Sequence, residues 1–99
     1  MSQHTIRVVA QVVARTEKIS EVQTILQEIV APTRQETGCL SYQLLHHRSN
    51  PAVFLFIEEW ADEQAIDTHF GTAHIQQALA KVTPMLAQAP DIQRYTLLA

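Results

Sequence analysis

The residues best suited to chemistry in this chain lie close together, at the end of one apolar segment and shortly after it. Glu58 and Trp60 end the segment, and His69 and His74 follow. A carboxylate at the end of an apolar strand is poorly solvated, so we expect a nearby group to balance its charge or donate a hydrogen bond to it. Histidine can do this and can also transfer protons near neutral pH. If the four side chains meet in one cavity, they form an acid/base site.

Alternation along the expected strand gives its two glutamates different surroundings. Glu58 points to the same side as Phe54 and Phe56. Glu59 points to the opposite side. We expect Glu58 to be a buried group that orients an imidazole or pairs with an arginine. The alternative, a half-hydrated residue at the end of the strand, stays open for Glu58 and is the interpretation we favour for Glu59.

The two histidines flank a break between predicted helices. His69 lies at the end of one helix and His74 in the first turn of the next, with Gly71 between them. The positive end of a helix disfavours an imidazolium, so His74 should stay neutral and able to accept a proton, as a general base must. The alternative is that either histidine serves only in capping or packing.

A metal site is the competing interpretation of the histidines, and the sequence argues against it. His46 and His47 are adjacent on a predicted strand, so their side chains point to opposite faces. His69 and His74 lack the four-residue spacing of a helical zinc-binding pair, and no CxxC motif occurs. We therefore predict no metal ligands. No glycine-rich phosphate loop occurs either, so no nucleotide cofactor is expected.

Composition limits the class of protein. The chain has 99 residues, of which 46% are hydrophobic and 17% charged, and this suits one small domain over residues 1–99. A net charge of −3 with scattered Lys and Arg argues against nucleic acid as a partner. Cys39 is the one cysteine, and we expect a buried structural thiol in a reducing cytoplasm. No signal-like segment and no apolar run of membrane length is evident, so we expect a soluble cytoplasmic protein.

Hydrophobic periodicity predicts the order strand, helix, strand, strand, helix, strand. The strands are expected at 5–15, 39–47, 53–60 and about 92–98, the helices at 19–30, 62–68 and 72–82, and a hairpin turn at 49–51. Pro32 should kink or end the first helix because it has no N–H to donate to the carbonyl of Glu28, and Gly38 can stop the helix at positive φ. Asp62 and Thr72 are the expected caps of the later helices.

This order suits an α+β fold of the ferredoxin-like, split βαβ kind, with a four-stranded antiparallel sheet and helices on one face. The first three strands carry apolar residues on both faces, as Val8 and Val9 do on the first strand. Helices can cover only one face, so the other needs a partner. A second copy of the chain is the simplest partner, and we expect a face-to-face homodimer.

Several spaced motifs resemble those of the antibiotic biosynthesis monooxygenase domain family. They are Glu36-Thr37-Gly38-Cys39-Leu40-Ser41-Tyr42, Glu58-Glu59-Trp60, His69 and Thr72-Ala73-His74. The resemblance covers nearly the whole chain and is greatest to small bacterial, quinol monooxygenase-like members. It implies a dimeric α+β barrel built from two ferredoxin-like protomers, each with a pocket between helices and sheet.

The resemblance also implies roles for the candidate residues. His69 or His74 would be the base, and Glu58 would set its orientation and tautomer. The expected substrate contacts are Tyr42, Trp60 and Phe56. The implied reaction is the oxygenation of a small phenol or quinol by O2 without metal, flavin or nicotinamide.

Function varies among families that share a fold, so alternatives stay open. The haem-degrading branch has an asparagine, a tryptophan and a histidine where this chain has Val12, His69 and Leu79, which disfavours haem degradation. A branch that isomerises small phosphorylated hydroxyketones would need a cationic clamp in the pocket. Candidates for that clamp are Arg34, Arg48 and Arg94. A dimeric module that binds small ligands without catalysis is the third possibility.

Overall fold

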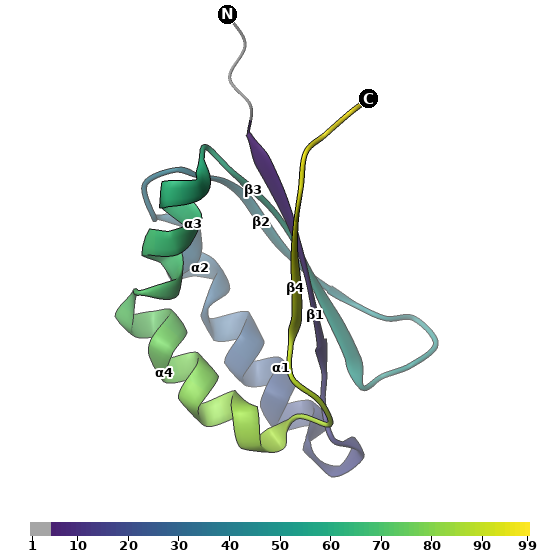
Figure 1. Ribbon diagram of the computed structural model, residues 1–99. Coiled ribbons are helices and arrows are strands. Elements are labelled where there is room, and N and C mark those ends of the chain that lie inside the picture. The colour runs from purple at the N-terminus through teal and green to yellow at the C-terminus, as the bar shows by residue number, and fades with distance from the viewer. Residues whose placement is uncertain (1–4) are drawn as a thin grey trace, which may run out of the picture.

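The computed structural model describes residues 5–99 and shows a four-stranded sheet with the helices gathered on one of its faces (Figure 1). In chain order the elements are β1 (Ile6–Val13), the 3-10 helix η1 (Thr16–Lys18), α1 (Ile19–Glu28), α2 (Val30–Arg34), β2 (Cys39–His46), β3 (Val53–Trp60), α3 (Glu63–Phe70), α4 (Ala73–Val82), the 3-10 helix η2 (Thr83–Met85) and β4 (Asp91–Tyr95). The predicted order of strands and helical regions is confirmed.

The sheet has the strand order β2-β3-β1-β4, and every neighbouring pair is antiparallel. The predicted hairpin of β2 and β3 is present, and β3 then pairs along its full length with β1. This is the ferredoxin-like α+β arrangement that the sequence predicts. It places β3, which carries Glu58, in the interior of the sheet.

Two strands are shorter than the periodicity suggests. The first ends at Val13, and Ala14 forms only an isolated bridge to Leu86. The last was expected to run to about residue 98 but ends at Tyr95. Tyr95 faces Arg7, which is the second residue of β1, so only Ile6 of that strand remains beyond this pair.

The first helical region is interrupted where proline chemistry requires it. α1 ends at Glu28 and α2 begins at Val30, because Pro32 has no N–H for the Glu28 carbonyl. Gly38 is not the direct end of this region, since α2 stops at Arg34. It lies in the turn before β2 with φ of 88°, a conformation that favours glycine.

Only one of the two predicted caps acts through its side chain. The Asp62 carboxylate accepts a 2.8 Å hydrogen bond from the backbone N–H of Ala65, as an N-cap should. Thr72 takes the N-cap position of α4, but its side chain forms no capping bond there. Its hydroxyl instead donates to the carbonyl of His69 over 2.7 Å. That bond joins the end of α3 to the start of α4.

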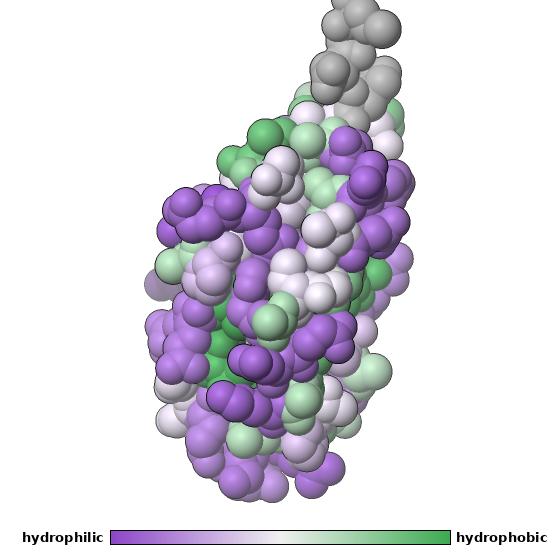
Figure 2. Space-filling view, turned by 90° about the vertical axis from the view of Figure 1, so that its left-hand side faces the viewer, coloured by the Kyte–Doolittle hydropathy of each residue, from purple (hydrophilic) through white to green (hydrophobic). Residues whose placement is uncertain are grey.

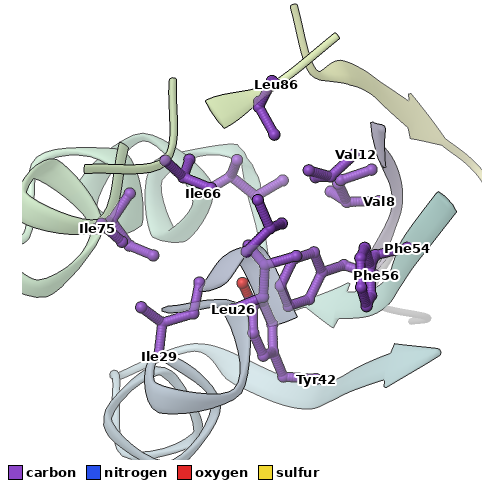
Figure 3. Packing of buried hydrophobic residues seen from close by; sticks show 14 of the residues in the cluster. Val8, Val12, Leu26, Ile29, Tyr42, Phe54, Phe56, Ile66, Ile75 and Leu86 are labelled. Atoms are coloured by element: carbon purple, nitrogen blue, oxygen red, sulfur yellow. The ribbon is translucent and has the colours of Figure 1, made fainter. Parts of the chain in front are cut away.

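The core fills the space between the helices and one face of the sheet. In β3 the buried residues alternate with half-buried ones, and in β1 the same alternation holds from Val8 onwards, so each strand has a core face and an open face. Figure 3 shows labelled side chains of the two layers pointing toward one another: Val8, Val12, Tyr42, Phe54 and Phe56 from the sheet and Leu26, Ile29, Ile66 and Ile75 from the helices. Trp60 and Phe54 are among the largest fully buried side chains.

None of the helices in residues 5–99 lies over the opposite face of the sheet (Figure 1). Apolar residues of three strands meet there, with Val9 beside Ile57 and with Leu55 beside Leu45. Leu45 is 45% exposed. Among residues 5–99, none of the helices has both the length and the apolar character needed to span a lipid bilayer.

Candidate active site

Glu58 is a buried carboxyl group held by an indole. It lies on the core face of β3 and is only 5% exposed. The Nε1 atom of Trp60 donates a 2.8 Å hydrogen bond to its Oε1 atom. The two residues share a face because they are two positions apart on one strand. Of the two interpretations left open for Glu58, the structure has the buried one, whereas Glu59 is half-buried, as favoured for it.

The surroundings of Glu58 disfavour its charged form. The pKa of Glu58 is raised to about 7, mainly by burial. The hydrogen bond from Trp60 acts in the opposite direction, and the negative charge of Glu36 adds to the effect of burial. A carboxyl group with such a pKa can hold or release a proton near neutral pH.

His69 and His74 converge on a third residue, Glu36. The Oε2 atom of Glu36 lies 2.9 Å from Nδ1 of His69 and 2.6 Å from Nε2 of His74. Its Oε1 atom lies 3.1 Å from the same Nδ1 atom. One carboxylate thus accepts hydrogen bonds from two imidazoles that belong to different helices.

The carboxylate that orients the histidines is therefore not the one predicted. Glu58 was expected to set the orientation and tautomer of the base, but it is bonded to Trp60, and Glu36 takes that position. Strand alternation places Glu58 on the core face, yet it cannot tell which of two nearby carboxylates reaches an imidazole. Glu36 belongs to the motif that carries the family resemblance, but no pairing role followed from its position. The one sequence signal for a role of Glu36 is its position two residues before Gly38, in the turn that leads into β2.

Local structure explains how Glu36 reaches the histidines. Gly38 turns the chain at positive φ, and its carbonyl accepts a 2.8 Å bond from the N–H of Ala61, which leads out of β3. A Cβ atom at position 38 would lie 2.6 Å from Cβ of Ala65, so the turn packs directly against α3. α3 carries His69 at its far end. The turn and the two helices therefore hold the three polar side chains in one place.

The environment of His69 favours a neutral ring. The residue is 2% exposed, and burial lowers its pKa below the ordinary value even though the hydrogen bond and negative charge of Glu36 act in the opposite direction. Because a carboxylate can only accept, the proton of the neutral ring lies on Nδ1, and Nε2 keeps the lone pair. Among residues 5–99 no side chain or backbone group is hydrogen-bonded to that Nε2 atom. This is the form that a general base requires.

Aromatic rings fix the position of the imidazole. The ring centroid of His69 lies 4.7 Å from that of Trp60 and 5.7 Å from that of Tyr42. Tyr42 also packs at 5.1 Å on Phe56. Burial raises the pKa of Tyr42 above its ordinary value, with the negative charge of Glu58 adding to the effect, so its hydroxyl stays protonated. Of the expected contact residues, Tyr42 and Trp60 are thus neighbours of His69, and Phe56 packs on Tyr42. Tyr42 and Phe56 line the cavity described next, whereas Trp60 is not among its described lining residues.

A cavity lies between the helices and the core face of the sheet. Of the predicted acid/base residues, Glu58 and His69 line it, and His74 is not among its described lining residues. Its polar lining comes from Tyr42, Glu58 and His69. The remaining lining is apolar and comes from Ala10, Val12, Leu26, Ile29, Phe56, Phe70, Ile75, Ala78, Leu79, Val82, Pro90 and Ile92. The cavity is narrow, about 60 Å³. That is room for a few waters, so side chains must move for an aromatic ring to enter. Figure 2, which faces the helical side, shows a hydrophobic strip recessed among hydrophilic side chains.

No arginine or lysine is among the described residues that line this cavity. Two of the three arginines considered for an anion clamp have partners elsewhere. Arg34 donates a 3.0 Å hydrogen bond to the backbone carbonyl of Tyr42. Arg94 forms ion pairs with Glu63 and Asp67 on the surface. The cavity therefore suits an uncharged ligand.

Glu36, His69 and His74 together offer donor atoms that a divalent cation could use. The ligand atoms of Glu36, His69 and His74 lie within 4.8 Å of one another. The spacing argument against a metal did not foresee this group, because its third member comes from the turn before β2. Two imidazole nitrogens and one carboxylate oxygen would suit zinc or a similar ion. All three atoms already share hydrogen bonds, so a cation would have to replace the two ring protons.

The other candidates lie outside this site. His46 stacks on Phe54, and its Nε2 atom lies 2.7 Å from the carbonyl of Pro51. His47 accepts hydrogen bonds from backbone N–H groups of the turn after β2. Cys39 is half-buried, and burial raises the pKa of its thiol, with the charges of Glu36 and Glu58 adding to the effect. Such a thiol is a weak nucleophile.

Comparison with known proteins agrees with this fold and this set of motifs. The sequence model of the family described as antibiotic biosynthesis monooxygenase matches residues 5–81. The chain belongs to the antibiotic biosynthesis monooxygenase family. Among members and relatives, it is 32% identical over 88 residues to a Bacillus subtilis protein named "Putative monooxygenase YcnE", and the match covers 89% of this chain and 93% of that protein.

Solved structures and a longer relative extend the comparison. A crystal structure described as an antibiotic biosynthesis monooxygenase has a TM-score of 0.90 and 32% identity, covering 95% of this chain and 99% of the other. The uncharacterised Synechocystis protein sll1783 is 29% identical over 90 residues. The chain spans only 61% of the length of that protein. These likenesses support a monooxygenase-like function and name no substrate for this chain.

Proposed function

We propose that this protein is a cofactor-independent monooxygenase that oxygenates a small aromatic phenol or quinol with O2. Membership of the family supports the reaction class. The observation that carries the proposal is His69, a buried imidazole that lines an apolar cavity while its Nδ1 atom is held by Glu36. Its burial favours the neutral form. A base in such a cavity can deprotonate a phenol and keep water away from the products of its oxidation.

The reaction begins with transfer of a proton. Nε2 of His69 takes the phenolic proton, and the resulting imidazolium is stabilised by the Glu36 carboxylate on the other side of the ring. The phenolate passes one electron to O2, giving a phenoxyl radical and superoxide. The two radicals combine at a ring carbon in the dry cavity to form a peroxide anion, which takes the proton back from the His69 imidazolium. This gives the hydroperoxide adduct and neutral His69. Loss of water from that adduct gives a quinone, so one phenol and one O2 yield one quinone and one H2O.

His74 has a supporting role in this scheme. Its Nε2 atom binds the same Glu36 oxygen as His69 does, from the side nearer the solvent, and its side chain is 27% exposed. It therefore helps to fix the carboxylate that in turn fixes His69. Glu36 and His74 are positioning residues, whereas His69 meets the substrate.

The cavity favours a neutral aromatic substrate over a phosphorylated hydroxyketone. A phosphate carries negative charge and needs cationic or N–H donors. The described lining offers one carboxyl group, one phenol and one imidazole, and otherwise apolar surface. A planar ring with one or two hydroxyl groups would place its polar edge at Glu58 and His69 and its apolar edge among the helices.

We also propose that the protein acts in the cytoplasm as a homodimer that pairs through the open face of the sheet. The support is the apolar character of that face, where Leu45, Leu55 and Ile57 lie side by side with no helix above them. A second copy would bury these side chains.

Oxygen uptake tests the enzymatic proposal. Purified protein is given a panel of hydroquinones and polyphenols in an oxygen electrode, and the rate is compared with autoxidation in buffer. Wild type should exceed that rate, and His69→Ala should lose roughly 100-fold or more of the catalysed rate. His46→Ala is the matched control, since this exposed histidine lies outside the cavity and its loss should leave the rate unchanged. Uptake by wild type no faster than autoxidation would refute the proposal and leave a ligand-binding role.

A further inference from the structure

The proposed reaction needs a second proton-transfer group besides His69, because one step both removes a proton from the substrate and donates a proton to it. When the peroxide adduct loses water, the ring carbon gives up its C–H proton, the O–O bond breaks, and the departing hydroxide takes up a proton. One imidazole nitrogen cannot accept the first proton and donate the second in a single step. The site therefore needs a base and an acid that reach two neighbouring atoms of one substrate.

We propose that Glu58 is this acid, so that its carboxyl group donates a proton to the departing oxygen while His69 accepts the proton from the ring carbon. The inference rests on the proposed function and adds a catalytic residue to it. Atoms balance: the adduct becomes quinone and H2O, His69 ends as imidazolium, and Glu58 ends as carboxylate. Return of one proton from His69 to Glu58, directly or through water, restores both groups.

Glu58 and His69 lie where an acid and a base could reach the same substrate. Glu58 lines the cavity from β3, and His69 lines it from α3. The indole of Trp60 contacts both, donating its N–H to Glu58 over 2.8 Å and lying 4.7 Å from His69 between ring centroids. They are thus neighbours around one ring, but no hydrogen bond joins them in the described part of the chain. A substrate between them could meet both.

Trp60 also determines where Glu58 carries its proton. An indole N–H can only donate, so Oε1 of Glu58 is the accepting oxygen. A proton on the carboxyl group is then placed on Oε2. The surroundings favour the protonated form, since the group is buried. The groups whose charge or hydrogen bond influences it are Glu36, Tyr42, Cys39 and Trp60, and none of these is a cation.

The product distribution tests the role of Glu58. With a hydroquinone as substrate, the adduct can lose water to give a hydroxyquinone, or it can lose H2O2 to give the simple quinone. Glu58→Gln keeps an oxygen for the Trp60 N–H but has no acidic proton. We expect this variant to consume O2 within a few-fold of the wild-type rate while the H2O2 released per O2 consumed rises at least several-fold. Incorporation of ¹⁸O from ¹⁸O2 into the quinone should fall in proportion.

A conservative variant and a surface control complete the experiment. Glu58→Asp retains a carboxyl group, so it should give an H2O2 yield between those of wild type and Glu58→Gln, a recovery that a purely structural role would not produce. Glu21→Gln, an exposed change on α1, should match wild type. An unchanged H2O2 yield in folded Glu58→Gln, or loss of O2 uptake altogether in both Glu58 variants, would overturn the inference and leave the proposed function standing. Wild-type protein that takes up no O2 would overturn both.

Discussion

The Nε2 atom of His74 lies 2.6 Å from Oε2 of Glu36, although 38 residues separate them in the chain. The same oxygen lies 2.9 Å from Nδ1 of His69. This carboxylate therefore joins the turn before β2 to the helices α3 and α4. Because the imidazole of His69 also lines the cavity, a contact that holds the fold together also sets which ring nitrogen is free to accept a proton.

Glu36→Gln should damage the base without removing it. A glutamine offers one accepting oxygen and one donating NH2. If its oxygen replaces Oε2, the NH2 takes the place of Oε1, 3.1 Å from Nδ1 of His69, where one donor faces another. One ring must change its tautomer or turn, and His69 then loses the free Nε2 lone pair in part of the molecules. We expect the catalysed rate of O2 uptake to fall roughly 100-fold. Circular dichroism should show retained secondary structure, and a rate equal to that of Glu21→Gln would contradict this role.

Gly38→Ala should be one of the most destabilising single-methyl changes in the chain. The position has φ of 88°, and a Cβ atom there would lie 2.6 Å from Cβ of Ala65. Left-handed backbone strain and the clash together should lower the free energy of unfolding by on the order of 3 kcal/mol. Urea unfolding followed by circular dichroism measures it.

Gly71→Ala is the matched control for that experiment. Gly71 has φ of −89°, and an added Cβ would meet its nearest neighbour, the Thr68 carbonyl, at 3.5 Å. That is an ordinary contact, so the change in unfolding free energy should stay within about 1 kcal/mol. Equal effects of the two substitutions would show that the turn before β2 is not constrained as described.

The fold was predictable because its signals are local. The alternation of Val8, Val12, Phe54 and Phe56 identifies strand faces, and Pro32 marks the break in the first helical region. The predicted ends of the strands were less accurate, because the end of a strand depends on how far its partner strand pairs with it. The last strand ends at Tyr95, which faces Arg7 near the start of β1, and no property of residues 96–98 signals this.

The site was only partly predictable because its central contact is not local. Burial of Glu58 follows from strand alternation, and the neighbouring positions of His69 and His74 follow from the helix break. The pairing of both histidines with Glu36 depends on how the turn before β2 packs against α3, which periodicity does not describe. The same limit applies to Thr72, whose hydroxyl binds the His69 carbonyl instead of capping its own helix.

Chelation should leave the proposed activity intact. In the proposed scheme His69 accepts a proton and O2 accepts an electron directly from the phenolate, so no step uses a metal. Dialysis against EDTA should change the rate of O2 uptake by less than about twofold, which is small beside the 100-fold effects expected of a catalytic group. Loss of activity that one added divalent ion restores would contradict this and would direct attention to the Glu36, His69 and His74 donor set.

Leu55→Asp should separate the proposed dimer. Leu55 lies on the open face of β3, opposite Leu45 of β2 and Gln11 of β1, so a charge there would have to be buried at the interface. We expect wild type to sediment as a dimer at micromolar concentration and the variant to dissociate with a Kd at least roughly 100-fold higher. Gln27→Asp, an exposed change on α1, adds the same charge and should leave the dimer intact. A wild-type monomer would refute the proposed interface.

The pH dependence of stability should show two opposing contributions. The pKa of Glu58 is raised, so the folded state binds a proton more tightly than the unfolded state, and this contribution is lost as pH rises from 4.5 toward about 7. The pKa of His69 is lowered, so its neutral form favours the folded state, and that contribution is lost as pH falls below 6.5. Wild type alone therefore cannot separate them.

Comparison of wild type with Glu58→Gln isolates the glutamate, because His69 is present in both. Glutamine has no titration, so the difference between their unfolding free energies reports Glu58 alone. With a folded-state pKa of about 7 against 4.5, wild type should lose on the order of 3 kcal/mol relative to the variant between pH 4.5 and 7, and nothing further above that range. Urea unfolding at a series of pH values measures the difference. A difference that stays constant, or that grows in favour of wild type as pH rises, would show that Glu58 is ionised in its cavity and could not serve as the acid.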